Sequence, residues 1–290
     1  MSRIGSRLTS AISRRRWILI GAVLLSSACD GKTALSPSPP LPVPGPVAPP
    51  PSVPQNTAPR INVIYMSSNR VEADERLELA ADVVDEETPI DQLFYQWTSD
   101  KGTGMFIGSG RILEWQAPHL KPTPDIYVLT LTVVERYEDG GEVAENRTSA
   151  SVKVHYNDSN REIWDLGLTF LNDFTTYTTS PEACVRNFSD SCRGKQAELS
   201  DIRENRKNFQ ILSGKYALND IALNGNKTFG TSHVSCEFRS LVKATGKTET
   251  ATGICTLTAV YEPETWQWYL CDSLFSGTAT SNLNLRGLVP

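Results

Sequence analysis

Two periodicities divide the chain. Between residues 60 and 156, apolar and polar positions alternate with a period of two over several short runs, and turn-forming residues separate these runs. After residue 157 the apolar positions first recur at the three-to-four-residue spacing of a helix and then return to alternation. The pattern predicts two folded domains, the first made of strands (60–156) and the second of helices followed by strands (157–277).

Each run of the first domain presents one apolar face. These faces are formed by Leu77, Leu79, Ala81 and Val83; Leu93, Tyr95 and Trp97; Leu113, Trp115 and Ala117; Tyr127, Leu129, Leu131 and Val133; and Ala150, Val152, Val154 and Tyr156. Several short strands with regular turns are typical of an antiparallel β-sandwich. Trp97 and Trp115 fall on apolar faces, so we expect them in the core; the alternative is a platform on which a sugar stacks.

Three segments in order, LELAADVVDEETPIDQLFYQW, GTGMFIGSGRILEWQAP and YVLTLTVVERYEDGG, resemble bacterial immunoglobulin-like domains of the polycystic kidney disease (PKD) type. The resemblance covers nearly the whole first domain. It implies an all-β immunoglobulin-like sandwich that acts as a spacer, an adhesion unit or a carbohydrate-associated module.

A group of carboxylates follows the second strand run of this domain. Its members are Asp85, Glu86, Glu87, Asp91 and Asp100. Calcium binds to 6–8 oxygens, but the spacing matches no fixed calcium loop. We therefore expect a solvated acidic turn, with calcium binding as the alternative, and we predict no metal site.

The second domain begins with helical signals. Residues 159–162 (SNRE) form a capping box, and the apolar positions after it predict a helix of about four turns. Serine and proline at 180–181 indicate a second helix start, and a charged third helix is predicted over 196–207. Strands follow from residue 216, with turns expected at 224–226, 245–246 and 263–264.

Helices followed by a meander of long strands that closes on WQWYLCDSLF resemble the nuclear-transport-factor-2-like (NTF2-like, or SnoaL-like) cone. The resemblance implies an α+β fold in which a curved antiparallel sheet wraps around the helices and leaves a pocket. Members of this group range from hydratases and isomerases that use an Asp/His pair to binding and assembly domains without catalysis.

His233 is the only histidine of the second domain, which restricts acid–base chemistry there. Its candidate partners are Asp173, Asp201 and Asp220, and Asp272 on the final strand is a second candidate for the pocket. We expect an ordinary strand histidine and no catalytic residues; the alternative is an enzyme with an Asp/His acid–base site.

Five cysteines lie in the second domain, namely Cys184, Cys192, Cys236, Cys255 and Cys271. If the hairpins turn symmetrically about residues 245–246 and 263, then Cys236, Cys255 and Cys271 form a row across three strands. Our first choice is a Cys236–Cys255 disulfide with a second bond between Cys184 and Cys192. Alternatively, Cys184 or Cys192 bonds to Cys271 and links helix to sheet.

The N-terminal segment RRRWILIGAVLLSSAC (14–29) combines a basic run, a short apolar run and small residues before Cys29. It resembles a bacterial lipoprotein signal peptide (1–28), in which that cysteine is lipidated and becomes the new N-terminus. The apolar run is much shorter than the ~20 residues that span a bilayer. The alternative is ordinary cleavage and a secreted product.

Residues 29–59 contain a proline-rich stretch that is predicted to be an extended spacer at ~3 Å per residue. The alternative is a ligand for a proline-recognition domain. The tail from 278 to 290 is polar and is predicted to be flexible.

Charge restricts the partners. Removing residues 1–28 takes away five arginines and no acidic residue, so the formal net charge changes from −5 to −10. An acidic chain argues against nucleic acid as a partner. We find no phosphate loop, zinc spacing, nucleophile frame or dinucleotide motif, and we predict no cofactor. The sequence thus predicts a lipid-anchored envelope protein, on the inner or outer membrane, that binds a protein, glycan or small ligand.

Overall fold

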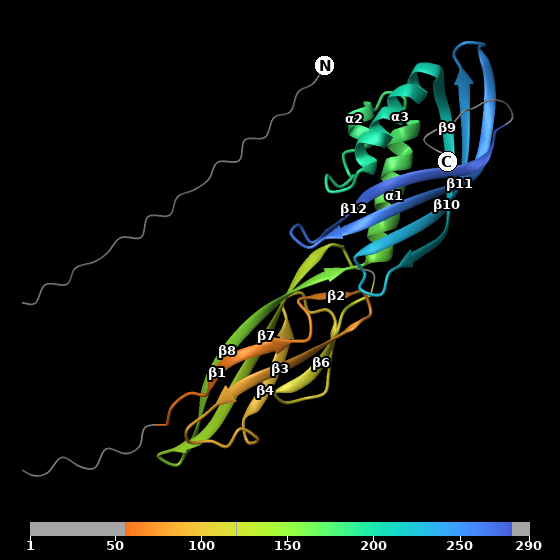
Figure 1. Ribbon diagram of the computed structural model, residues 1–290. Coiled ribbons are helices and arrows are strands. Elements are labelled where there is room, and N and C mark those ends of the chain that lie inside the picture. Colours follow the sequence, from red (N-terminus) through yellow and green to blue (C-terminus); the bar gives the residue numbers. More distant parts are fainter. Residues whose placement is uncertain (1–55, 120, 280–290) are drawn as a thin grey trace, which may run out of the picture. The chain divides into compact units, whose positions relative to one another are not determined.

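The computed structural model describes residues 56–119 and 121–279 (Figure 1). The predicted signal peptide, Cys29, the linker up to residue 55 and the tail from residue 280 lie outside the described residues. Two hydrophobic cores are present, one in a β region (60–157) and one in an α+β region (158–279). The chain is therefore a β-rich protein with more than one domain, as the two periodicities predicted.

The β region contains two four-stranded sheets around one core. One sheet has the order β1-β3-β6-β5, with β1 (Arg60–Met66), β3 (Arg76–Val84), β6 (Ile112–Gln116) and β5 (Met105–Ile107). The other has the order β2-β8-β7-β4, with β2 (Arg70–Glu72), β8 (Glu142–Asn157), β7 (Asp125–Asp139) and β4 (Phe94–Ser99). Only β2 and β8 pair in parallel within these two sheets.

The alternation of β7 explains its place at the centre of the core. Tyr127, Leu129, Leu131 and Val133 are all buried, because successive side chains of a strand point to opposite faces. Trp97 and Trp115 are buried as well, so the expectation that they pack in the core is confirmed.

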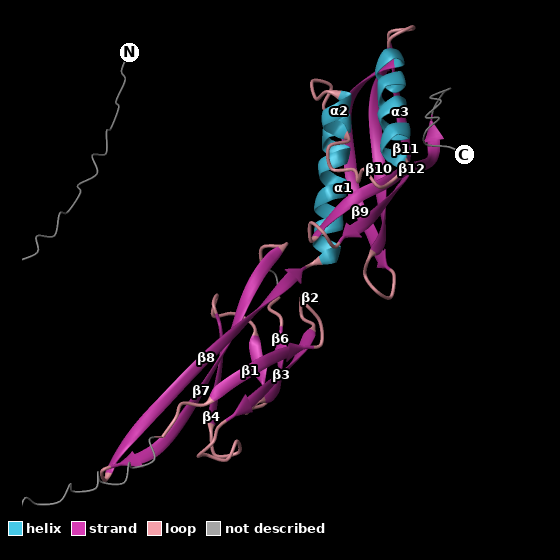
Figure 2. Cartoon of the chain, turned by 60° about the vertical axis from the view of Figure 1, so that its left-hand side comes forward, coloured by secondary structure: helices cyan, strands magenta, loops and turns pink. Residues whose placement is uncertain are grey.

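The α+β region has three helices on one side of a four-stranded meander, β12-β11-β10-β9 (Figure 2). The helices are α1 (Ser159–Thr175), α2 (Pro181–Cys184) and α3 (Gly194–Asn208). The strands are β9 (Phe209–Leu223), β10 (Phe229–Val242), β11 (Lys247–Glu262) and β12 (Gln267–Ala279). Helix α1 places its apolar stripe, including Ile163, Phe170 and Phe174, against the sheet. In the described residues, no helix has both the length and the apolar character needed to cross a bilayer.

The start of α1 differs from the predicted capping box by one residue. Asp158 is the N-cap, and its carboxylate accepts the backbone N–H of Arg161 at 3.1 Å. Glu162 lies at the fourth helical position, where a capping box has its glutamate at the third, and its carboxylate still accepts the backbone N–H of Asp158 at 3.1 Å. Ser159 is thereby free to bond to residues outside the helix.

Ser159 lies in a largely buried polar cluster with Arg70 and Glu72. The Glu72 carboxylate accepts both the backbone N–H and the hydroxyl of Ser159, at 2.9 and 2.8 Å. The Arg70 guanidinium pairs with Glu72 at 2.5 Å, donates to the Ser159 hydroxyl at 2.9 Å and lies 3.7 Å from the ring centroid of Tyr261. Trp268 also donates to the Ser159 hydroxyl, at 2.9 Å. This hydroxyl thus uses its one donor and both acceptor positions.

Cys236 is bonded to Cys255, as our first choice predicted, although the register differs from the symmetrical count. Cys236 lies opposite Gly253 and Cys255 lies opposite Val234, so the two cysteines are diagonal neighbours with Cα atoms 6.1 Å apart. Both side chains remain on the inner face, since an offset of two residues preserves the face of a strand.

The predicted Cys184–Cys192 bond is wrong. Cys271 is not in the row of cysteines, because a bulge in β12 leaves it unpaired between Leu270 and Asp272. It is bonded instead to Cys192, with Cα atoms 5.2 Å apart, and this bond links the segment before α3 to the sheet. Gly194 makes the approach possible, since a Cβ there would overlap the carbonyl oxygen of Cys271. Cys184 is a buried free thiol whose pKa is raised by burial.

Peptide mapping without reduction should recover the Cys192–Cys271 and Cys236–Cys255 links, with Cys184 as the free thiol. The Cys192→Ser/Cys271→Ser double variant should lose about 4 kcal/mol of unfolding free energy, because this bond spans 79 residues and restricts the unfolded chain strongly. Denaturant titration measures this loss. A peptide that joins Cys184 to Cys192 would contradict the assignment.

Replacing Arg70 by methionine should destabilise the protein by about 3–5 kcal/mol, because the carboxylate of Glu72 then stays buried without its cation. The Arg70→Met/Glu72→Gln double variant removes both charges while an amide oxygen remains for Ser159, so it should recover part of the loss. Urea unfolding of both variants provides the measurement. Equal stability of Arg70→Met and the native protein would show that the cluster contributes little.

Candidate functional site

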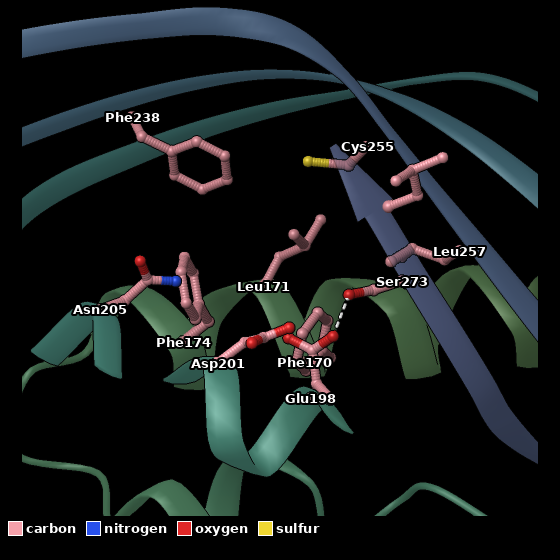
Figure 3. Close-up of a pocket in the computed structure, with 11 residues that line it drawn as sticks. Phe170, Leu171, Phe174, Glu198, Asp201, Asn205, Phe238, Cys255, Leu257 and Ser273 are labelled. Carbon is pink, nitrogen blue, oxygen red and sulfur yellow. Dashed lines mark hydrogen bonds between the residues drawn. The ribbon is translucent and has the colours of Figure 1, made fainter. Parts of the chain in front are cut away.

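The candidate site is a hollow between α3, α1 and the inner face of the sheet (Figure 3). Its walls are formed by Phe170, Leu171 and Phe174 from α1; Glu198, Asp201 and Asn205 from α3; and Phe238, Cys255, Leu257, Ser273 and Leu274 from the sheet. Most of the lining is apolar. A polar group placed there is therefore removed from water, and its chemistry depends on the few hydrogen-bond partners nearby.

Glu198, Asp201 and Asn205 reach the hollow because they lie three and four residues apart on one face of α3. Ser273 reaches it because of the bulge at Cys271. Before the bulge, Trp268 and Leu270 point inward; after it, the inward positions are Ser273 and Phe275.

Glu198 is the central polar group. Ser273 donates a hydrogen bond of 2.5 Å to its carboxylate, drawn as a dashed line in Figure 3. Burial raises the pKa of Glu198 to about 7; the bond from Ser273 acts in the opposite direction, and the negative charges of Asp201 and Asp272 add to the increase. A carboxyl group in this state exchanges its proton near neutral pH, which is a property of general acids and bases.

The hollow is nearly filled. About 20 Å³ of its interior is accessible to water, which is room for about one water molecule. Pockets for small organic ligands have volumes of roughly 300–1,000 Å³. The arrangement thus holds a proton in an apolar setting, but this conformation does not admit a substrate.

His233 lies outside the hollow, on the outer face of the sheet. Its Nδ1 is 2.7 Å from the carboxylate of Asp220, the residue directly opposite on β9. The side chains of His233 and Asp220 are 40% and 61% exposed. Of the three candidate partners, the structure thus brings Asp220 to the histidine. Asp173 pairs with Arg186 at 2.7 Å, and Asp201 lines the hollow.

Asp272 is also outside the hollow, so its assignment to the pocket is wrong. It is exposed, because the bulge at Cys271 reverses the alternation that would have turned it inward with Leu270. Sequence reasoning missed Glu198 and Ser273. The spacing of Glu198 and Ile202, one turn apart on α3, was a signal that this glutamate shares the inward face.

The acidic group in the β region stabilises loops. One carboxylate oxygen of Asp85 accepts the backbone N–H groups of Glu87 and Thr88, and that of Asp100 accepts the N–H of Val128. Within the residues that the structure describes, no three His, Cys, Asp or Glu side chains converge in a way that suits a metal ion.

No family model matches the chain, and no curated protein matches it. Solved structures similar to it include a ketosteroid isomerase-like protein from Erwinia carotovora atroseptica, with 14% identity, a TM-score of 0.37 and coverage of 42% of this chain and 97% of the other. A conserved protein from Planctomyces limnophilus has 11% identity, a TM-score of 0.33 and coverage of 41% and 96%. A DUF4785 family protein from Legionella pneumophila has 8% identity, a TM-score of 0.25 and coverage of 74% and 56%.

Glu198→Gln should change the pH dependence of stability. The pKa of Glu198 is about 7 in the folded chain and close to its ordinary value of 4.5 in the unfolded chain, so the folded state binds more protons between these values. The native protein should therefore lose unfolding free energy as the pH rises from 4.5 to 7, by up to about 3 kcal/mol. Glutamine removes this loss and still accepts the bond from Ser273.

Urea titrations at several pH values measure the effect, with Glu264→Gln in an exposed turn as the matched control. We expect the Glu198→Gln curve to be flatter than the native one and the control curve to follow the native one. Parallel curves for all three proteins would show that Glu198 titrates like a surface carboxylate.

Proposed function

We propose that this protein is a non-enzymatic binding module of the bacterial envelope, tethered by a lipid on Cys29. The observation that carries the proposal is the filled interior of the α+β region, which leaves about 20 Å³ beside Glu198. His233, the histidine of the alternative acid–base site, is on the outer face of the sheet and pairs with Asp220. Neither the hollow beside Glu198 nor the His233–Asp220 pair forms an apolar pocket in which a histidine and a carboxylate contact a substrate.

The fold assignments belong to the same proposal. For the β region it is an immunoglobulin-like sandwich of the PKD type, supported by two four-stranded sheets around one core. For the α+β region it is an NTF2-like cone, supported by an antiparallel meander with helices on its inner side. In this view the linker acts as a spacer, and exposed surfaces of the folded regions bind the partner.

Two features support the envelope location. The disulfides Cys192–Cys271 and Cys236–Cys255 suit an oxidising compartment outside the cytoplasm. The basic, apolar and small-residue segments before Cys29 suit export and lipidation.

A second candidate function is an envelope enzyme, and Glu198 rather than His233 favours it. A carboxyl group with a pKa of about 7, hydrogen-bonded to Ser273 and lined by aromatic rings, has the properties of a general acid or base. This candidate requires the hollow to open, because its present volume excludes a substrate.

Mass spectrometry of the membrane-extracted protein should show a diacylglyceryl or triacylated Cys29 at the N-terminus. Cross-linking in the native envelope should then capture the same partner, in the same yield, from the native chain and from Glu198→Gln, because binding does not use proton transfer. If Glu198→Gln instead retains a small bound substrate, or fails to form a product that the native chain forms, the protein is an enzyme. An unmodified N-terminus near Cys29 would contradict the lipid tether.

A further inference from the structure

The outer face of the β1-β3-β6-β5 sheet contains a hollow of about 540 Å³ that the proposed function does not yet use. Its lining includes Tyr65, Glu78, Ala80, Ile112 and Glu114. This volume falls within the range of small-ligand sites, in contrast to the filled hollow beside Glu198.

Strand register explains the shape of this hollow. Tyr65, Ala80 and Ile112 lie directly opposite one another on three adjacent strands. The small Ala80 forms the floor between two large side chains, and Tyr65 and Ile112 are 59% and 63% exposed. Exposed apolar side chains that surround a depression in this way are typical of an interaction site.

Two carboxylates lie in the next row of the same face. Glu78 is directly opposite Glu114, and like charges in this position repel one another. Arg76 pairs with Glu114 at 2.9 Å, on exposed side chains. Glu78 has no basic partner in the described part of the chain, so the hollow keeps an uncompensated negative charge beside apolar walls.

We propose that this hollow binds a lysine or arginine side chain of a peptide segment, with apolar residues on either side of the cation. The ammonium or guanidinium group would lie between Glu78 and Glu114 and relieve their repulsion. The face of the Tyr65 ring attracts a cation, and Ile112 packs against the methylene groups of the same side chain.

A neutral sugar fits less well, since it can stack on Tyr65 but leaves the charge of Glu78 uncompensated. The inference rests on the proposed binding role, and it names a surface and a class of partner for that role. It also suits the net negative charge of the chain, which favours encounters with basic segments.

The test is a calorimetric titration of the full chain in detergent micelles with acetyl-leucyl-lysyl-leucine amide. The matched probe replaces lysine by norleucine, which keeps the methylene groups and removes the charge. We expect the lysine peptide to bind at least tenfold more tightly than the norleucine peptide, and its binding to weaken with added salt.

Variants assign the binding to the hollow. Glu78→Gln and Tyr65→Ala should each weaken the binding of the lysine peptide by about tenfold, which corresponds to about 1.4 kcal/mol of binding free energy. Glu138→Gln and Ile126→Ala alter comparable exposed side chains on the other sheet and should leave binding unchanged. Because all four side chains are exposed, circular dichroism should show the native fold in each variant.

Equal binding of both peptides, binding that Glu78→Gln does not weaken, or the absence of lysine-peptide binding would each overturn the proposal. Binding of maltotriose that Tyr65→Ala abolishes would also overturn it and would reassign the hollow to glycans. If the lysine peptide does not bind but cross-linking in the envelope still captures a partner, only this inference fails. If neither experiment finds a partner, the proposed binding role fails too.

Discussion

The carboxylate of Glu72 binds the first residue of α1, at the point where the β region ends and the α+β region begins. Strand β8 ends at Asn157 and α1 begins at Ser159, with only Asp158 between them. Glu72 fixes Ser159 through its backbone N–H and its hydroxyl, and Arg70 balances the charge. Because α1 supplies much of the second core, the position of its first turn determines where the inner face of the sheet is covered. A buried ion pair of this kind is weak evidence for stability in itself, but losing one partner is costly.

Sequence periodicity predicted most elements of the fold but not the details that build the site. The alternation through Tyr127 and Val133 was sufficient for β7, and the spacing of Phe170 and Phe174 was sufficient for α1, because a whole face must be apolar to form a core. The bulge at Cys271 could not be predicted, because no residue type in this strand marks it. One unpaired residue is enough to reverse the inward and outward positions after it.

The same limit applies to charged residues. Glu198 lies in a strongly charged helix, where a glutamate is usually solvated. Its spacing from Ile202 indicates the inward face, and the packing of α3 shows that the side chain is buried there. His233 was singled out because histidine titrates near neutral pH, yet its strand places it on the outer face. The pKa of Glu198 is raised chiefly because packing removes its carboxyl group from water.

The link between Cys192 and Cys271 has a consequence for the order of events during synthesis. Under oxidising conditions, a chain that emerges N-terminus first exposes Cys184 and Cys192 while Cys271 is still 79 residues behind Cys192. Until Cys236 emerges, 44 residues after Cys192, each of the two early thiols has the other, eight positions away, as its nearest cysteine in the second domain. Correct pairing therefore requires either that Cys184 be buried early beneath α1 and α3, or that a thiol–disulfide exchange catalyst undo the local loop.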